Sequence, residues 1–376
     1  TAIRIGGCAT LHSSDSSQPH SFDAPTMEPL PLPPVLEPGA PHVTQLLLFA
    51  THAPNTGWRA PEESKFAEDL RYFLHSARQL RRSAQLWVLR FDVLRTTDTA
   101  SVDLQTSAAI EGGVYDWGLG AIRRELPALG ARMSSHPGLA ADCTEDLAQR
   151  AKRRAGDNQF KCTPDPNHRR YWYFHASLVL FNRSLGHHYP RLQYVWRVEP
   201  DVLYSGAWGN LFARFDGTPV DLLLPHTITY GTEARYPHWE LSAESWRHLP
   251  RSNWAYSLVS VGRYSLNFLA LLAARWRRGE LGYEEVFLLN TCVLAAPACT
   301  YRTFSNQRTD VNVGKRRAQA HSHVGDHFRY RPQWECAEFL HNYTAGRATG
   351  ELWHPVKNRS CWVAYLDSCD PTGCRG

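Results

Sequence analysis

The chain has 376 residues and a mass of 42.7 kDa, which fits one large α/β domain with appendages or two coupled halves. Apolar residues make up 43% of it and charged residues 20%, so a sizeable core is expected and wholesale disorder is excluded. The apolar runs are too short to span a bilayer. The net charge of +5 comes without a long basic block, so nucleic-acid binding is not indicated.

Residues 1–42 have the composition of a proline-rich stem or arm. Seven prolines between positions 25 and 41 favour an extended, polyproline-like chain that cannot bury a core. A disordered leader is the alternative. Because the sequence starts at Thr1 without a Met or a signal-peptide pattern, we expect that a segment upstream has been removed.

The following residues alternate between buried strands and amphipathic helices. The runs 43–50 and 85–91 are nearly continuous apolar strands, and a helical pattern over 66–80 joins them in a strand–helix–strand unit. Later elements follow the same alternation. Strands are expected over 192–198 and 220–224, and helices over 171–185 and 264–278 (ended by Gly279). Residues 283–296 are expected to form a helical or helix-to-strand segment. After residue 300 the chain turns polar, and we expect a loop-rich tail.

This alternation of strands and helices predicts an α/β fold with a mostly parallel sheet and helices on both faces. Ligands of such sheets bind beyond the carboxyl ends of the strands. Three polar strand ends are therefore candidate binding positions: Thr51, Asp92 and the turn Glu199-Pro200-Asp201.

The turn at 199–201 places two carboxylates two residues apart at the end of an apolar strand. If both face one side, they form a hard oxygen site for Mg²⁺ or Mn²⁺, and such a cation neutralises charge on a leaving diphosphate. An acidic turn paired with Arg197 or another base is the alternative.

The segment Tyr194-Val195-Trp196-Arg197-Val198-Glu199-Pro200-Asp201-Val202 resembles the acidic motif of the fungal Golgi α-mannosyltransferase family. The resemblance implies a GT-A fold, which is Rossmann-related, a nucleotide-diphosphate sugar donor, Mn²⁺ (or Mg²⁺), and an anchor upstream of the stem. It implies that Glu199 and Asp201 ligate the metal, with Asp201 also beside the donor diphosphate. In that family a histidine near the C-terminus completes the metal shell, and His327 is the nearest counterpart here, with His323 in reserve.

Residues 282–288 (GYEEVFL) resemble the start of a helix that carries an acceptor-site carboxylate in many GT-A enzymes. Glu284 and Glu285 are therefore the candidate catalytic residues, which would take a proton from the acceptor hydroxyl or anchor it. Alternatively, they only complement the helix N-terminus. We expect the donor nucleotide to lie across Thr51 and Asp92.

Nine cysteines and three glycosylation sequons, at Asn182, Asn342 and Asn358, favour the secretory pathway, either the Golgi lumen or the extracellular space. The expected organisation is a stem (1–42), a GT-A-like catalytic domain (43–335) and a cysteine-rich extension (336–376). The sequence thus predicts a metal-dependent glycosyltransferase (a hexosyltransferase, with mannose as one donor sugar) that acts on a glycan or glycoprotein acceptor. A non-catalytic GT-A-like binding or scaffold glycoprotein is the alternative.

Overall fold

A computed structural model describes most of the region after the stem. The described residues are 42–52, 62–80, 84–91, 101–103, 112–135, 173–234, 236, 238–239, 245–246, 249–304, 322–323, 328–344, 350–356, 358 and 360–368. The predictions for residues 1–41, Asp92 and His327 lie outside these ranges.

The larger sheet has eight strands in the order β11-β7-β10-β5-β1-β2-β4-β3. Its strands are β1 (Gln45–His52), β2 (Ala84–Phe91), β3 (Ser101–Asp103), β4 (Gly113–Trp117), β5 (Tyr194–Val198), β7 (Leu222–Leu224), β10 (Val261–Ser265) and β11 (Tyr301–Thr303). Strands β4, β2, β1 and β5 pair in parallel, whereas β10 runs antiparallel to both of its neighbours, β5 and β7. All strands except β10 and β3 therefore share one direction. The predicted mostly parallel α/β sheet is confirmed.

A smaller sheet in the order β12-β13-β14-β6 joins two distant parts of the chain. It consists of β12 (Ser322–His323), β13 (Phe328–Trp334), β14 (Leu352–Val356) and β6 (Leu203–Tyr204), and β8 (Ile228–Thr229) pairs separately with β9 (Ala255–Tyr256). Because β6 follows β5 after only a short turn, β14 is held next to the carboxyl end of β5.

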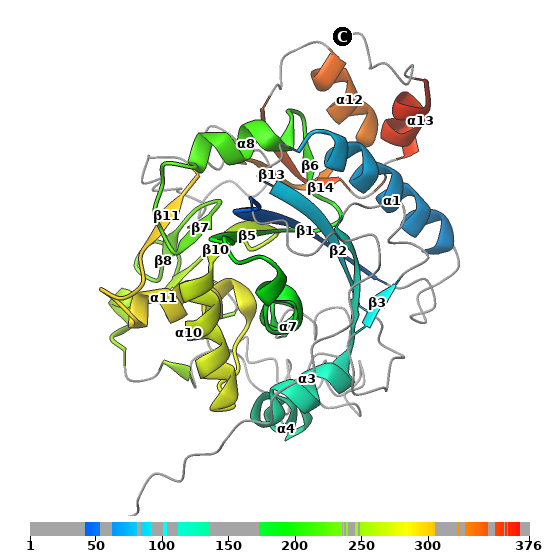
Figure 1. Cartoon of the computed structure of the whole chain (residues 1–376). Helices are drawn as coiled ribbons and strands as arrows, with labels where there is room; N and C mark the ends of the chain where they lie inside the picture. The colour runs from blue at the N-terminus through cyan, green and yellow to red at the C-terminus, as the bar shows by residue number, and fades with distance from the viewer. Residues whose placement is uncertain are drawn as a thin grey trace, which may run out of the picture.

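Helices cover both faces of the larger sheet (Figure 1). They are α1 (Glu62–Arg78), α3 (Leu119–Glu125), α4 (Pro127–Ser135), α7 (Ala176–Leu185), α8 (Trp208–Phe215), α10 (Leu266–Arg277), α11 (Glu284–Leu294), α12 (Cys336–Thr344) and α13 (Ser360–Ser368). None of these described helices combines the length and apolar character needed to cross a membrane.

Strand β1 shows why a continuous apolar run forms the centre of the sheet. Successive side chains of a strand point to opposite faces. Leu46 and Leu48 accordingly join the core beneath α7, α10 and α11, whereas Leu47 and Phe49 join the core that includes α1 and α8. All four are fully buried, so the run leaves no polar face.

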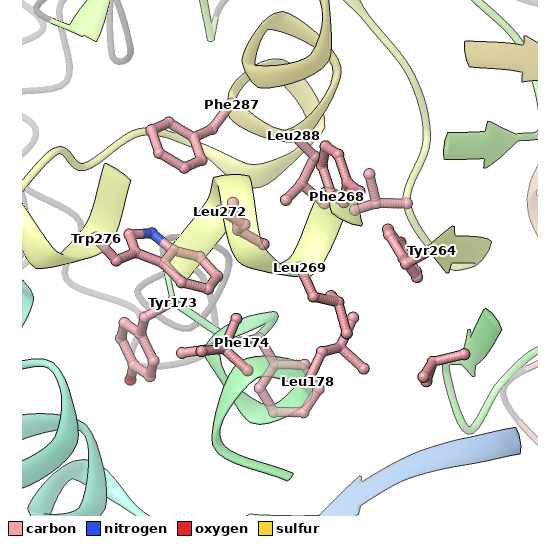
Figure 2. Close-up of a cluster of buried hydrophobic side chains, with 14 of the residues drawn as sticks. Tyr173, Phe174, Leu178, Tyr264, Phe268, Leu269, Leu272, Trp276, Phe287 and Leu288 are labelled. Carbon is pink, nitrogen blue, oxygen red and sulfur yellow. The ribbon is translucent and has the colours of Figure 1, made fainter. Parts of the chain in front are cut away.

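The first of these cores fixes the relative positions of α7, α10 and α11. Phe174, Phe268 and Phe287 lie among the leucines of these helices, with Trp276 stacked on Phe287 (Figure 2). Helix α10 begins where the Ser265 side chain accepts a hydrogen bond from the backbone N–H of Phe268. It ends before Gly279, whose φ of +73° suits glycine, as the sequence predicted.

The segment after residue 300 is more regular than the loop-rich tail expected from its composition. It forms β13, α12, β14 and α13, and its aromatic residues Trp334, Phe339, Trp353 and Trp362 are buried in the core that also contains Phe49. Strand β14 of this segment is supported by pairing to β6 and is buried on both faces. A short polar sequence reveals neither the pairing nor the burial.

A disulfide between Cys336 and Cys361 closes the part of this segment that contains β14, and a second bond joins Cys292 to Cys299. We expect the double variant Cys336→Ser, Cys361→Ser to lose about 3 kcal/mol of unfolding free energy, because the bond closes a loop of 25 residues. Urea unfolding measures the change.

The matched control is Cys292→Ser, Cys299→Ser, which opens a loop of only 7 residues at the end of α11. It should cost less stability. An unchanged urea midpoint in the Cys336, Cys361 variant would show that packing alone holds β14 in place.

Candidate active site

The acidic turn after β5 lies at the edge of the sheet where the parallel strands end. The backbone N–H of Glu199 donates to the carbonyl of Ser260 at 2.7 Å, and the N–H of Val202 donates to the carbonyl of Glu199 at 3.1 Å. The turn is therefore tight and anchored to the chain before β10. It leaves the carboxylates of Glu199 and Asp201 only partly exposed.

Strand β14 brings His354 to these two carboxylates. Leu352 pairs with Tyr204 and Trp353 with Leu203 in antiparallel register, and the N–H of Val356 donates to the carbonyl of Asp201 at 2.8 Å. Nε2 of His354 lies 3.6 Å from Oε2 of Glu199 and 3.5 Å from Oδ1 of Asp201. One ligand atom from each of the three residues falls within 4.8 Å of the others, so the group can hold a metal ion.

The charges of this group depend on one another. Burial disfavours the charged form of His354, but Asp201 and Glu199 outweigh it and raise the pKa of His354 to about 9. Burial likewise disfavours ionised Glu199, yet the hydrogen bond from His354 and the nearby Arg197 lower the pKa of Glu199 below its ordinary value. Without a cation, a protonated imidazole thus balances the acids. A metal ion would take over that role by displacing the proton.

Arg197 does approach Glu199, as the alternative interpretation of the acidic turn expected. However, its Nη2 reaches only Oε1 of Glu199, at 3.8 Å, whereas the other carboxylate oxygen faces His354. The guanidinium is completely buried and lies 4.7 Å from the centre of the Phe174 ring. The contact therefore orients one side of Glu199 and leaves the other side available.

The two adjacent glutamates at the start of α11 occupy different surroundings. Glu284 is buried, and both of its oxygens are used by His175: Oε1 accepts from the backbone N–H and Oε2 contacts Nδ1, each at 2.5 Å. Burial, opposed by Arg197, raises the pKa of Glu284 to about 8. Its carboxyl group is thus directed into the protein.

Glu285 is the more accessible of the pair. It accepts a hydrogen bond from the hydroxyl of Tyr236, and burial raises its pKa to about 7 although this hydrogen bond opposes the shift. The charges of Glu199 and His354 also influence the pKa of Glu285, so all three ionisable groups lie in one region of the protein. The backbone carbonyl of Glu285 accepts a hydrogen bond from the N–H of Ser257. A little further along the chain, the carbonyl of Ser260 accepts from the N–H of Glu199 in the acidic turn.

The aromatic residues between positions 230 and 254 divide into two groups. Trp239, Trp246 and Trp254 are buried and belong to the core. Tyr236 is half-buried and stacks on Tyr256, with ring centroids 3.8 Å apart and planes at 3°. This pair places an aromatic surface beside Glu285.

The remaining predicted residues are less closely connected to the acidic turn. Thr51 lies at the carboxyl end of β1, which pairs with β5 through Phe49 opposite Val198, so it shares the edge of the sheet with Glu199. Its hydroxyl donates to Asp69 of α1 at 3.1 Å. Asp92 and His327 lie outside the described residues, and of His323 the structure describes only the backbone, in β12.

Sequence reasoning missed His354 and His175. His354 stands in a short run, Leu-Trp-His-Pro-Val, whose apolar residues Leu352, Trp353 and Val356 are typical of a buried strand. That run carries no sign that it pairs with β6, and the denser group of histidines near His327 is the stronger signal in the sequence.

Comparison with solved structures finds distant likeness to two glycosyltransferases. No protein-family model and no curated protein matches it, so the mannosyltransferase resemblance gains no support from family models. Mouse xyloside xylosyltransferase 1 superimposes with a TM-score of 0.37 and 12% identity, covering 83% of this chain and 97% of the other. The galactosyltransferase LgtC, solved with donor and acceptor sugar analogues, gives 0.35 and 10%, covering 85% and 91%. Likeness at this level assigns neither substrate nor mechanism to this chain.

Proposed function

We propose that the protein is a metal-dependent glycosyltransferase that moves a sugar from a nucleotide-diphosphate donor to a glycan or glycoprotein acceptor. The observation that carries this proposal is the group of Glu199, Asp201 and His354 at the carboxyl edge of a mostly parallel sheet. That edge is where α/β sheets bind their ligands.

The donor set fits a divalent cation. Two carboxylate oxygens suit Mg²⁺ or Mn²⁺, and the imidazole nitrogen favours Mn²⁺, because Mg²⁺ prefers oxygen ligands. When bound, such a cation supplies positive charge to the leaving diphosphate. The protein's contribution is to hold the two acids on one side of a tight turn and to bring the histidine to them from another sheet.

Glu285 is proposed to act on the acceptor. Its carboxylate is partly exposed, its pKa of about 7 suits proton transfer near neutral pH, and Tyr236 orients it. The half-buried ring of Tyr236, backed by the buried ring of Tyr256, offers a flat apolar surface of the kind that packs against sugar rings. The acceptor hydroxyl is thereby directed to the same edge as the donor diphosphate.

The secretory pathway is the proposed compartment. The two disulfides of the described residues require an oxidising environment. The sequon asparagine Asn358 is exposed before α13, where its side-chain oxygen accepts from the hydroxyl and N–H of Ser360. We propose the Golgi lumen, with the stem linking the catalytic domain to an anchor.

A panel of nucleotide sugars tests the proposed activity. The purified protein is incubated with Mn²⁺ and single UDP- or GDP-sugars, with GDP-mannose included because of the sequence resemblance, and release of the nucleoside diphosphate is measured. We expect one donor to be hydrolysed and chelation of the metal to stop the reaction. If no donor were turned over, the alternative of a non-catalytic binding glycoprotein would replace the proposal.

A further inference from the structure

A buried chain of polar side chains leads from helix α11 to the acidic turn. Glu284 contacts His175 through Nδ1 and the backbone N–H, both at 2.5 Å. Nε2 of His175 lies 3.3 Å from Nη1 of Arg197, and Nη2 of Arg197 lies 3.8 Å from Oε1 of Glu199. The chain therefore ends on the carboxylate oxygen that does not face His354.

The chain is enclosed in the protein core. Glu284, His175 and Arg197 are each at most 1% exposed. Their backbones belong to α11, to the residue preceding α7, and to β5. Figure 2 shows the hydrophobic core between α7 and α11, and Val195 of β5 belongs to the same core. Because a buried charge pair is often no more stabilising than well-packed apolar residues, stability alone gives little reason for this arrangement.

The direction of each hydrogen bond follows from the chemistry of Arg197. A guanidinium group has only donors, so its contact with His175 requires a lone pair on Nε2. The hydroxyl of Tyr264 also lies 2.9 Å from Nε2 and can donate to the same lone pair. A neutral imidazole then carries its proton on Nδ1 and donates it to Glu284. The carboxylate of Glu284 accepts from both N–H groups of His175 in its ionised form, which predominates above its pKa of about 8. The second hydrogen of Nη1 goes to the carbonyl of Val259, at 3.3 Å.

The other end of the guanidinium faces Glu199. Nη2 makes no hydrogen bond to the described residues and lies in the ion pair with Oε1 of Glu199. With Nη1 fixed by His175 and Val259, the planar guanidinium cannot rotate away from this carboxylate without breaking both contacts.

We propose that Glu284 and His175 are positioning residues, which hold Arg197 so that it fixes one oxygen of Glu199 and leaves the other oriented for the cation. This inference rests on the proposed function, because it assigns the supporting contacts of the same metal site. Outer contacts of this kind typically change metal affinity by about 10–100-fold. The proposal also gives the two glutamates of α11 different roles: Glu284 supports the metal site, and Glu285 acts on the acceptor.

The variant Glu284→Gln tests the proposal because it preserves shape and reverses one hydrogen bond. The amide oxygen can still accept from the N–H of His175, but the amide NH₂ donates to Nδ1. The imidazole proton must then move to Nε2, where the hydroxyl of Tyr264 can accept it but Arg197 loses its acceptor and faces an N–H instead. The measurement is Mn²⁺ affinity without donor, by electron paramagnetic resonance of the free ion, at a pH above the pKa of Glu284 (about 8).

We expect Glu284→Gln to bind Mn²⁺ about 10–100-fold more weakly than the wild type. The control Glu125→Gln, at the end of α3 beside Arg124 and Arg183, should bind as the wild type does. Equal affinity in Glu284→Gln and the wild type would overturn the positioning role and leave the proposed function intact. A wild-type protein that binds no Mn²⁺ would overturn the metal site itself, and the inference with it.

If Glu284→Gln does not fold, the wild type labelled with ¹⁵N-histidine decides the question by nuclear magnetic resonance. A strongly downfield proton coupled to Nδ1 of His175 is the expected result, because that proton lies in the short contact with Glu284. A proton on Nε2 would overturn the proposed direction of the hydrogen bonds.

Discussion

Glu199→Gln, Asp201→Asn and His354→Asn are each expected to reduce hydrolysis of the donor by about a thousandfold or more. Each change removes one of the three groups that can hold the cation, and the loss of several kcal/mol of charge stabilisation corresponds to this factor. The rates of nucleoside diphosphate release at saturating donor, and at the Mn²⁺ concentration that just saturates the wild type, measure it.

The three variants should lose activity for the same reason, which is weaker binding of the cation. Mn²⁺ affinity is expected to fall in each, and excess Mn²⁺ should restore more activity to His354→Asn, which keeps both carboxylates, than to Glu199→Gln. The control Glu125→Gln changes a carboxylate to an amide at the far end of α3, where it pairs with arginines, and should retain full activity. Full activity in His354→Asn would show that His354, and with it β14, does not contribute to the metal site.

Glu285→Gln is expected to reduce transfer to the acceptor by about 10²–10⁴-fold while Mn²⁺ binding is retained, because Glu285 acts on the acceptor proton. The pH profile follows from the same role. A base must be ionised, so the transfer rate of the wild type should fall as the pH drops below about 7, the pKa of Glu285.

Tyr236→Phe gives a second, independent outcome for this prediction. The hydroxyl of Tyr236 lowers the pKa of Glu285 by hydrogen bonding to its carboxylate, so its removal should shift the acidic limb of the profile to higher pH. A profile that stays flat across neutral pH would show that Glu285 only anchors the acceptor hydroxyl. Transfer at the wild-type rate in Glu285→Gln would exclude both roles.

The central part of the fold could be predicted because its sequence pattern is strong. Strands β1, β2 and β5 are apolar on both faces, and this burial produces the continuous runs that the sequence shows. The position of Glu199 and Asp201 followed from the rule that parallel strands end at one edge. The regular structure after residue 300 did not follow, because β14 is defined by its pairing with β6 and β13 rather than by its own five residues.

The details of the site depend on contacts between distant segments. His354 reaches Glu199 only because β14 pairs beside the acidic turn, and the sequence could not distinguish it from the histidines near His327. Glu284 and Glu285 are adjacent, but neighbouring positions on a helix point about 100° apart. One therefore enters the core and the other faces Tyr236, a distinction that the motif Gly-Tyr-Glu-Glu does not contain.

The most direct test of the metal site is anomalous diffraction from crystals soaked with Mn²⁺ and a nucleoside diphosphate, with data collected at the manganese edge. The account predicts a peak between the carboxylates of Glu199 and Asp201 and Nε2 of His354, with the diphosphate beside it. Ordered nucleotide without a manganese peak at these three residues, or a peak bound elsewhere, would contradict it.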